Sequence, residues 1–161
     1  MLWDVIITLK NGYQVDTERS EFNMSCCHHE KKIITTDQAP KALGPYSAGV
    51  STGCMVFTAG QVGIDPATGK MVEGGVQAQA RQALTNLKAI LEAAGSGLDQ
   101  VVKTTVFLQD MGEFGLMNEV YATFFSGEFP ARSAVQVAAL PAGAAVEIEA
   151  VALLPCECGE C

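Results

Sequence analysis

Apolar side chains recur at helical spacing along residues 75–94, the most regular stretch of the chain. Polar side chains fill the other positions, so the predicted helix has one apolar and one polar face. Gly95 follows directly, where a glycine commonly ends a helix. A second helix is predicted over residues 113–125, with aromatic and aliphatic side chains facing inward and Gly127 at its end.

Short apolar stretches around the helices are typical of strands. β-branched residues dominate residues 101–108, and further strands are predicted at 55–59, 133–140 and 145–154. Strands, helix, strand, helix and strands, in this order, predict an α+β fold with one mixed sheet and two helices on one face. No third helix remains to cover the other face, so we expect association with other subunits there.

Both ends of the chain differ from this body. Residues 1–31 form an N-terminal appendage, or Met24 is the true start; both interpretations stay open at this point. We expect a single domain over residues 32–155, followed by a cysteine-rich tail at 156–161.

The composition excludes some classes of partner. The chain has 161 residues, 48% hydrophobic and 17% charged, with a net charge of −8. An acidic chain is repelled by phosphate backbones and by anionic lipid, so nucleic acid is a poor candidate partner. No apolar run reaches the ~18 residues of a membrane span, and the first residues lack a basic leader, so we expect a cytoplasmic protein.

Five of the six cysteines lie in the two end segments, and Cys54 lies in the body. Cysteines 156, 158 and 161, with Cys26, Cys27 and two neighbouring histidines, are soft ligands that zinc or copper can bind. The N-terminal cluster lacks the spacing of a structural zinc site, so we predict reactive thiols or plain disorder, and no metal site.

Arg132 is the only charged residue in the apolar stretch 129–141. We expect the strand that follows it to be largely buried, and a buried guanidinium needs an anionic partner. That partner is either an internal carboxylate, from Glu128, Glu147 or Glu149, or the carboxylate of a bound ligand. The guanidinium fork suits a bidentate grip on a small carboxylate, and Arg132 begins a predicted strand beside a loop, where pockets form.

Four other polar positions are candidates for the same chemistry. Glu147 and Glu149 alternate with apolar residues, so both carboxylates point to one face of a strand, roughly 7 Å apart. That face is either solvated or lines a site in which a carboxylate orients water. Tyr46 follows a Gly-Pro turn, and Asn118 lies on the second helix near aromatic residues; local sequence alone favours packing for Tyr46 and solvation for Asn118.

The body carries no cofactor-binding motif. Residues 60–63 lack the pattern of a phosphate loop, and both histidines lie in the N-terminal segment, so a hydrolytic triad is not available. A cofactor-free site with one carboxylate-binding arginine suits easy chemistry, such as the addition of water to a C=N bond.

Several separated motifs, in this order, resemble the reactive-intermediate deaminase family, RidA, also called the YjgF family. The resemblance covers roughly residues 33–154 and leaves out residues 1–31 and the cysteine-rich end. The matching stretches are 39–46, 57–61, 79–95, 102–108, 129–133 and 146–150.

The resemblance implies a homotrimer of chorismate-mutase-like subunits, with the sheets forming a central barrel and three clefts between subunits. It implies cofactor-independent hydrolysis of reactive 2-imino acids to 2-oxo acids and ammonia. The substrates would be 2-aminoacrylate with its tautomer 2-iminopropanoate, and 2-iminobutanoate.

The resemblance also assigns roles within the cleft. Arg132 matches the arginine that grips the substrate carboxylate, and Tyr46 matches a cleft tyrosine. Glu147 matches the carboxylate proposed to position or activate water, and Asn118 matches a cleft asparagine.

Three small residues would complete the lining of the cleft. Backbone groups near Gly60 and Ala134 are expected to face the substrate. Many active members have serine where this chain has Ala59, and cysteine where it has Ala134. The missing hydroxyl at Ala59 leaves room for a second hypothesis, a non-catalytic module that binds a small 2-oxo acid. A ribonuclease, an activity attributed to some relatives, is the third hypothesis, and the acidic balance argues against it.

Overall fold

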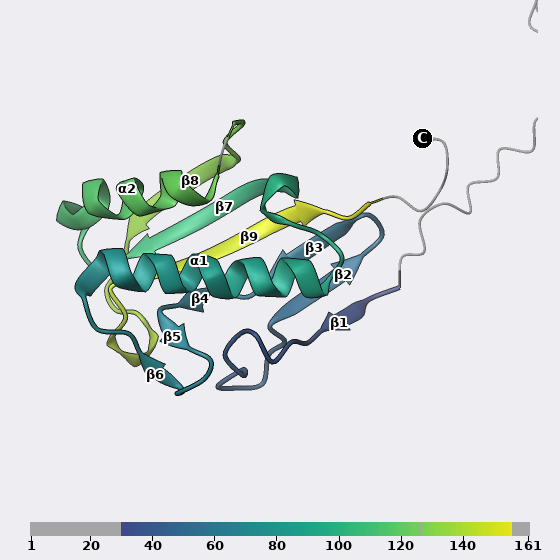
Figure 1. The fold of residues 1–161 in the computed structure, drawn as a ribbon, viewed down its shortest axis with the longest axis horizontal. Coiled ribbons are helices and arrows are strands. Elements are labelled where there is room, and N and C mark those ends of the chain that lie inside the picture. Colours follow the sequence, from purple (N-terminus) through teal and green to yellow (C-terminus); the bar gives the residue numbers. More distant parts are fainter. Residues whose placement is uncertain (1–29, 126, 156–161) are drawn as a thin grey trace, which may run out of the picture.

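Two helices cover one face of a seven-stranded mixed sheet (Figure 1). The computed structural model describes residues 30–125 and 127–155. The predicted 156–161 tail, five of the cysteines, and all but the last two residues of the predicted 1–31 segment lie outside the described residues. The predicted α+β architecture is confirmed for the body.

The helices are α1 (Gly75–Ala93) and α2 (Phe114–Phe124), close to the predicted bounds. The strands are β1 (Lys32–Ile34), β2 (Gly49–Thr52), β3 (Met55–Thr58), β4 (Gln61–Val62), β5 (Ile64–Asp65), β6 (Lys70–Met71), β7 (Val101–Leu108), β8 (Ala131–Gln136) and β9 (Val146–Leu153). Single 3₁₀ turns η1 (Leu98–Gln100), η2 (Met111–Glu113) and η3 (Pro141–Gly143) lie between them.

The strands of the sheet are ordered β1-β2-β3-β9-β7-β8, and β4 pairs with β9 beyond the end of β3. All neighbours are antiparallel except β7 and β8, which are parallel because α2 connects them as a crossover. This crossover places β8 at the edge of the sheet. β5 and β6 form a separate two-stranded hairpin.

The core lies between the helices and the near face of the sheet. Val146, Ile148, Ala150 and Ala152 of β9 are buried under the helices, and the alternate residues of β9 point to the opposite face. The apolar stripe predicted for α1 is buried against them. Burial of this alternating set fixes which side chains of each strand face the helices.

The face of the sheet opposite the helices carries an apolar row. Ile33, Val50, Phe57 and Val151 are direct cross-strand partners along β1, β2, β3 and β9. The side chains of Ile33 and Phe57 are 51% and 41% exposed. No helix among the described residues covers this row.

The strand that carries Arg132 differs from its prediction. It spans Ala131–Gln136 rather than 133–140, and it is mostly exposed rather than largely buried. The physical reason is its position: an edge strand has a neighbour on one side only, and the apolar sequence itself does not reveal that position. Arg132 itself is half-buried, under α2.

No helix within the described part of the chain is both long enough and apolar enough to cross a membrane.

Two glycines provide a matched test of this packing. A Cβ atom at Gly63 would lie 2.6 Å from the Cα atom of Gln79, on the backbone of α1, whereas a Cβ atom at Gly115 meets nothing within 4 Å. We expect Gly63→Ala to lower the free energy of unfolding by about 1–3 kcal/mol, because the backbone of α1 must move. Gly115→Ala, inside α2, should raise it by about 0.5–1 kcal/mol. Denaturant unfolding of both variants checks this, and equal effects of the two would contradict the close approach.

Candidate active site

Arg132 lies against aromatic rings at the edge of the sheet. It is the second residue of β8, and its guanidinium reaches back under α2. The guanidinium carbon lies 4.5 Å from the ring centroid of Tyr121 and 5.4 Å from that of Phe114. Both distances fall within the ~6 Å range of a cation–π interaction, so the aromatic faces of α2 stabilise the cation.

No carboxylate within the described residues pairs with Arg132. Glu128, Glu147 and Glu149 all lie beyond salt-bridge distance of the guanidinium. Among the described residues the ion pair is on α1, where Nζ of Lys88 lies 3.7 Å from Oε1 of Glu92. Within the described residues, Arg132 therefore has no internal acid as its partner. The guanidinium fork remains open to an external anion.

A cavity of about 270 Å³ opens beside the guanidinium. Asn118 lines it, and its Oδ1 atom is buried and accepts no hydrogen bond from the described residues. A buried acceptor without a donor is unfavourable, so this oxygen suits a ligand that brings an N–H or O–H group. The lining residues are Asn118, Tyr121, Ala122, Phe129, Pro130 and Arg132.

Tyr121 is a member of this site that the sequence interpretation assigned only to the core. Its hydroxyl lies 2.7 Å from the Oγ1 atom of Thr104, and both residues are buried. Burial raises the pKa of the Tyr121 phenol, while the hydrogen bond to Thr104 and the charge of Arg132 act in the opposite direction. The phenol is therefore neutral at physiological pH. The signal that would have identified it is the strand register, which places Thr104 directly beside Arg132.

Glu147 lies on the other face of the sheet. It alternates with buried Val146 and Ile148 of β9, and its side chain packs over the Cα atom of Gly60. A Cβ atom at Gly60 would collide with the Oε1 atom of Glu147, so only glycine leaves room for this carboxylate. Burial raises the pKa of Glu147, and the neighbouring charge of Glu149 raises it further. A carboxylate with a raised pKa is better suited to move protons near neutral pH.

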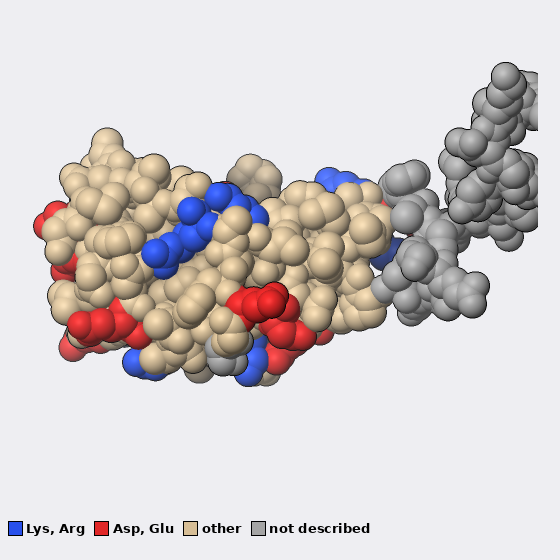
Figure 2. Space-filling model, turned by 90° about the horizontal axis from the view of Figure 1, so that it is seen from above, with Lys and Arg blue, Asp and Glu red and all other residues tan. Residues whose placement is uncertain are grey.

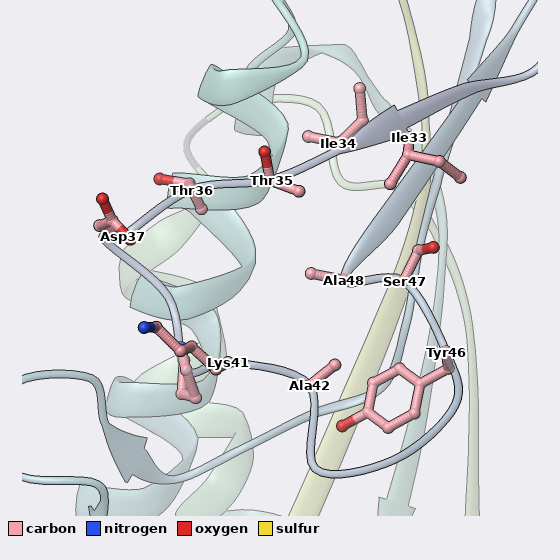
Figure 3. A pocket seen from close by; sticks show the side chains of 11 residues that line it. Ile33, Ile34, Thr35, Thr36, Asp37, Lys41, Ala42, Tyr46, Ser47 and Ala48 are labelled. Carbon is pink, nitrogen blue, oxygen red and sulfur yellow. The ribbon is translucent and has the colours of Figure 1, made fainter.

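Tyr46 lines a different cavity, of about 410 Å³, between the loop that follows β1 and the start of β2 (Figure 3). Its hydroxyl accepts a hydrogen bond from the backbone N–H of Leu43 at 3.2 Å. Ala48 lines the same cavity, and its carbonyl accepts from the backbone N–H of Ala59 at 2.8 Å. The segment that carries Ala59 thus pairs with the edge of this cavity, and the Tyr46 side chain itself is 50% exposed.

The predicted site residues thus fall into two groups within one chain. The first group, the arginine half-site, is Arg132, Asn118 and Ala134, with Ala134 on the same face of β8 as Arg132. The second group, the glutamate half-site, is Ala59, Gly60 and Glu147, whereas Tyr46 lines the separate cavity beside Ala48.

The two half-sites lie on opposite faces of the sheet. The partner of Arg132 across the strands is buried Thr104, on the helix side, whereas the partner of Glu147 is Phe107, on the open side. Successive residues of a strand point to opposite faces, so the two side chains diverge within one chain. A single copy brings together each half-site but not the two halves.

One face of the molecule is weakly charged. Figure 2 shows one short streak of Lys and Arg side chains in the middle of a largely neutral face, with acidic side chains toward its margins. An extended basic surface is not present on this face.

Comparison with known proteins gives a consistent match over the body. Residues 36–154 match the model of the family described as Endoribonuclease L-PSP. A mouse protein named 2-iminobutanoate/2-iminopropanoate deaminase is 54% identical over 123 residues, which cover 76% of this chain and 91% of the mouse protein. The crystal structure of E. coli TdcF with bound serine superposes with a TM-score of 0.74 at 48% identity, covering 77% of this chain and 99% of that one. The structure of the YjgF gene product of E. coli gives 0.73 at 50% identity, covering 76% and 98%.

The raised pKa of Glu147 provides a direct test of the glutamate half-site. We expect the Glu147 carboxyl to titrate above the ordinary range of glutamate, and Glu149→Gln to lower its midpoint, because a like charge is removed. Carbon-13 NMR titration of the side-chain carboxyls measures both midpoints. Glu92→Gln, on the far end of α1, is the control and should leave the Glu147 midpoint in place. An unchanged midpoint in Glu149→Gln would show that the two carboxyls do not interact.

Proposed function

This chain belongs to the Endoribonuclease L-PSP family, the RidA or YjgF family, and from that premise we propose that it hydrolyses reactive 2-imino acids to 2-oxo acids and ammonia. The proposed substrates are 2-iminobutanoate and 2-iminopropanoate, the latter with its tautomer 2-aminoacrylate. Relatives from mouse and human, 54% and 50% identical to this chain, are named 2-iminobutanoate/2-iminopropanoate deaminase.

The single observation that carries the proposal is the open guanidinium of Arg132. It lies on aromatic rings, has no carboxylate partner within the described residues, and borders a cavity of about 270 Å³. A small 2-imino acid carries a carboxylate that the guanidinium fork can bind through two parallel hydrogen bonds. The serine bound to TdcF is likewise a small amino acid with a carboxylate.

Asn118 supplies the second element of recognition. Its unpaired Oδ1 atom faces the same cavity as Arg132. An imino nitrogen carries an N–H that this oxygen can accept, whereas the keto oxygen of the product offers no donor. Asn118 therefore favours the imine over the oxo acid, which helps the product to leave.

The chemistry needs one water molecule and one proton-transfer group. In the proposed reaction the water oxygen adds to C2 of the imine, and the Glu147 carboxylate takes the proton that the water loses. Glu147 returns this proton to the nitrogen, which gives a neutral carbinolamine. Glu147 then takes the proton of the carbinolamine hydroxyl and passes it to the leaving nitrogen, so that ammonia leaves and C2 becomes a ketone. A C=N bond is electrophilic enough for this sequence to proceed without a cofactor.

We propose that the active unit is a homotrimer in which the cleft between two copies joins an arginine half-site to the glutamate half-site of its neighbour. The opposite orientations of Arg132 and Glu147 within one chain support this arrangement. The exposed apolar row on the open face of the sheet supports it as well, because association would bury that row. In this proposal the open faces form the central barrel.

Two further assignments complete the proposal. The protein acts in the cytoplasm on a free small molecule, and residues 32–155 form the catalytic domain. RNA is not its substrate, because the chain carries a net charge of −8 and the face in Figure 2 lacks an extended basic surface.

Ala59 favours one competing function, a module that binds a 2-oxo acid without turning an imine over. Its methyl group supplies no hydroxyl to the glutamate half-site. Stabilisation of the wild-type protein by a 2-oxo acid, without any acceleration of imine hydrolysis, would favour this module over the enzyme.

The assigned role of Arg132 can be tested kinetically. With 2-iminobutanoate generated in the assay by an amino-acid oxidase, we expect the wild-type protein to accelerate loss of the imine over spontaneous hydrolysis. Arg132→Ala should lower kcat/KM by at least about 100-fold, because both the charge and the bidentate contact are lost. Arg81→Ala, an exposed arginine of α1, is the matched control and should retain wild-type activity. Activity of Arg132→Ala equal to that of Arg81→Ala would rule out the assigned role.

A second prediction tests whether the site is shared between copies. Arg132→Ala and Glu147→Gln should each be inactive alone. When the two variants are unfolded together, mixed in equal amounts and refolded, about one cleft in four should contain both wild-type residues. Recovery of about a quarter of the wild-type activity is therefore expected, with a trimeric mass by analytical ultracentrifugation. A refolded trimeric mixture without activity would place both residues in one copy.

A further inference from the structure

The guanidinium of Arg132 lies over a ring that is itself held by a buried hydrogen bond. Its closest aromatic contact is the ring of Tyr121, with 4.5 Å between the guanidinium carbon and the ring centroid. The hydroxyl of that ring lies 2.7 Å from the Oγ1 atom of Thr104, in a position closed to solvent. Thr104 is the register partner of Arg132 on the neighbouring strand β7, and it is 0% exposed.

These contacts close a ring of three residues. Strand pairing joins Arg132 to Thr104, the buried hydrogen bond joins Thr104 to Tyr121, and the cation–π contact joins Tyr121 back to Arg132. Tyr121 also stacks on Phe125, with ring centroids 4.6 Å apart, so the opposite side of its ring is packed. The hydroxyl bond ties the far end of the phenol ring to β7.

We propose that Thr104 and Tyr121 act as positioning residues that hold the Arg132 guanidinium in the orientation required to receive a substrate carboxylate. This inference rests on the proposed function for its kinetic readout. The guanidinium has no carboxylate within the described residues to fix its direction, so the aromatic face beneath it sets the orientation of the guanidinium. A tyrosine rather than a phenylalanine is needed there because only the hydroxyl links the ring to the strand that carries the arginine's partner.

The choice of Thr104 as partner follows from its surroundings. A buried hydroxyl is stable only when it is hydrogen-bonded, and the phenol of Tyr121 satisfies it. In return, Thr104 satisfies the phenol, whose pKa is raised by burial. Replacing either partner leaves the other buried and unpaired, so both replacements should release the same ring.

The test uses a hydroxyl that can be removed and restored at one position. Thr104→Val removes the hydroxyl at nearly constant volume, and Thr104→Ser restores it. Tyr121→Phe removes the other partner and keeps the aromatic face. The control is Thr58→Val on β3, which also removes a buried hydroxyl bond, from the Ala150 backbone N–H to Oγ1 at 2.9 Å. Two strands, β9 and β7, separate Thr58 from β8.

The kinetic readout separates positioning from stability. We expect Thr104→Val and Tyr121→Phe each to raise KM for 2-iminobutanoate about five- to tenfold, with a smaller change in kcat. The double variant should match either single one, because both remove one hydrogen bond. Thr104→Ser should return KM to within about twofold of wild type, and Thr58→Val should destabilise the fold with KM unchanged.

A second readout needs neither ligand nor activity. The Arg132 Nε–Hε proton, identified as the NMR signal lost in Arg132→Lys, should be shifted upfield by the ring beneath it. That shift should be lost in Thr104→Val and kept in Thr104→Ser and Thr58→Val. Equal KM values and equal shifts in Thr104→Val and Thr58→Val would overturn the positioning role. An inactive wild-type protein would instead overturn the proposed function, and the NMR shift would still decide the positioning role.

Discussion

The proposed active site depends on a cation that lies against aromatic rings rather than beside an acid. A guanidinium withdrawn from water needs compensation, and a cation–π contact supplies about 0.5–2 kcal/mol of it. For Arg132, the rings of Tyr121 and Phe114 supply this cation–π stabilisation. The guanidinium fork itself has no carboxylate partner among the described residues. In the proposed function, the carboxylate of a small substrate meets the remaining electrostatic demand.

The topology of the sheet explains how such a cation remains accessible. The crossover through α2 sends β8 to the edge, parallel to β7, so that Arg132 emerges between the sheet and the helix rather than inside the core. The same alternation turns Glu147 to the opposite face of the sheet, where Gly60 leaves room for its carboxylate. Because one chain holds Arg132 and Glu147 on opposite faces, the proposed catalysis requires that two copies associate.

Much of the fold can be predicted from sequence. The periodicity of residues 75–94 gives α1 to within one residue, and the β-branched run 101–108 gives β7 at its observed bounds. The exposure of β8 could not be predicted, because an apolar edge strand and an apolar central strand look alike in sequence. The site shows the same division. Arg132 stands out as an isolated charge and Glu147 as one of two acids in an apolar strand. Thr104 and Tyr121 resemble ordinary core residues until the strand register and the ring contact place them beside the arginine.

The most direct measurement is a crystal structure of the protein soaked with 2-oxobutanoate, the product of the proposed reaction. We expect the carboxylate of the ligand to occupy the Arg132 fork through two hydrogen bonds, with Glu147 of a neighbouring copy on the other side of C2. A fork already closed by a protein carboxylate, with the ligand bound elsewhere or not at all, would contradict the account.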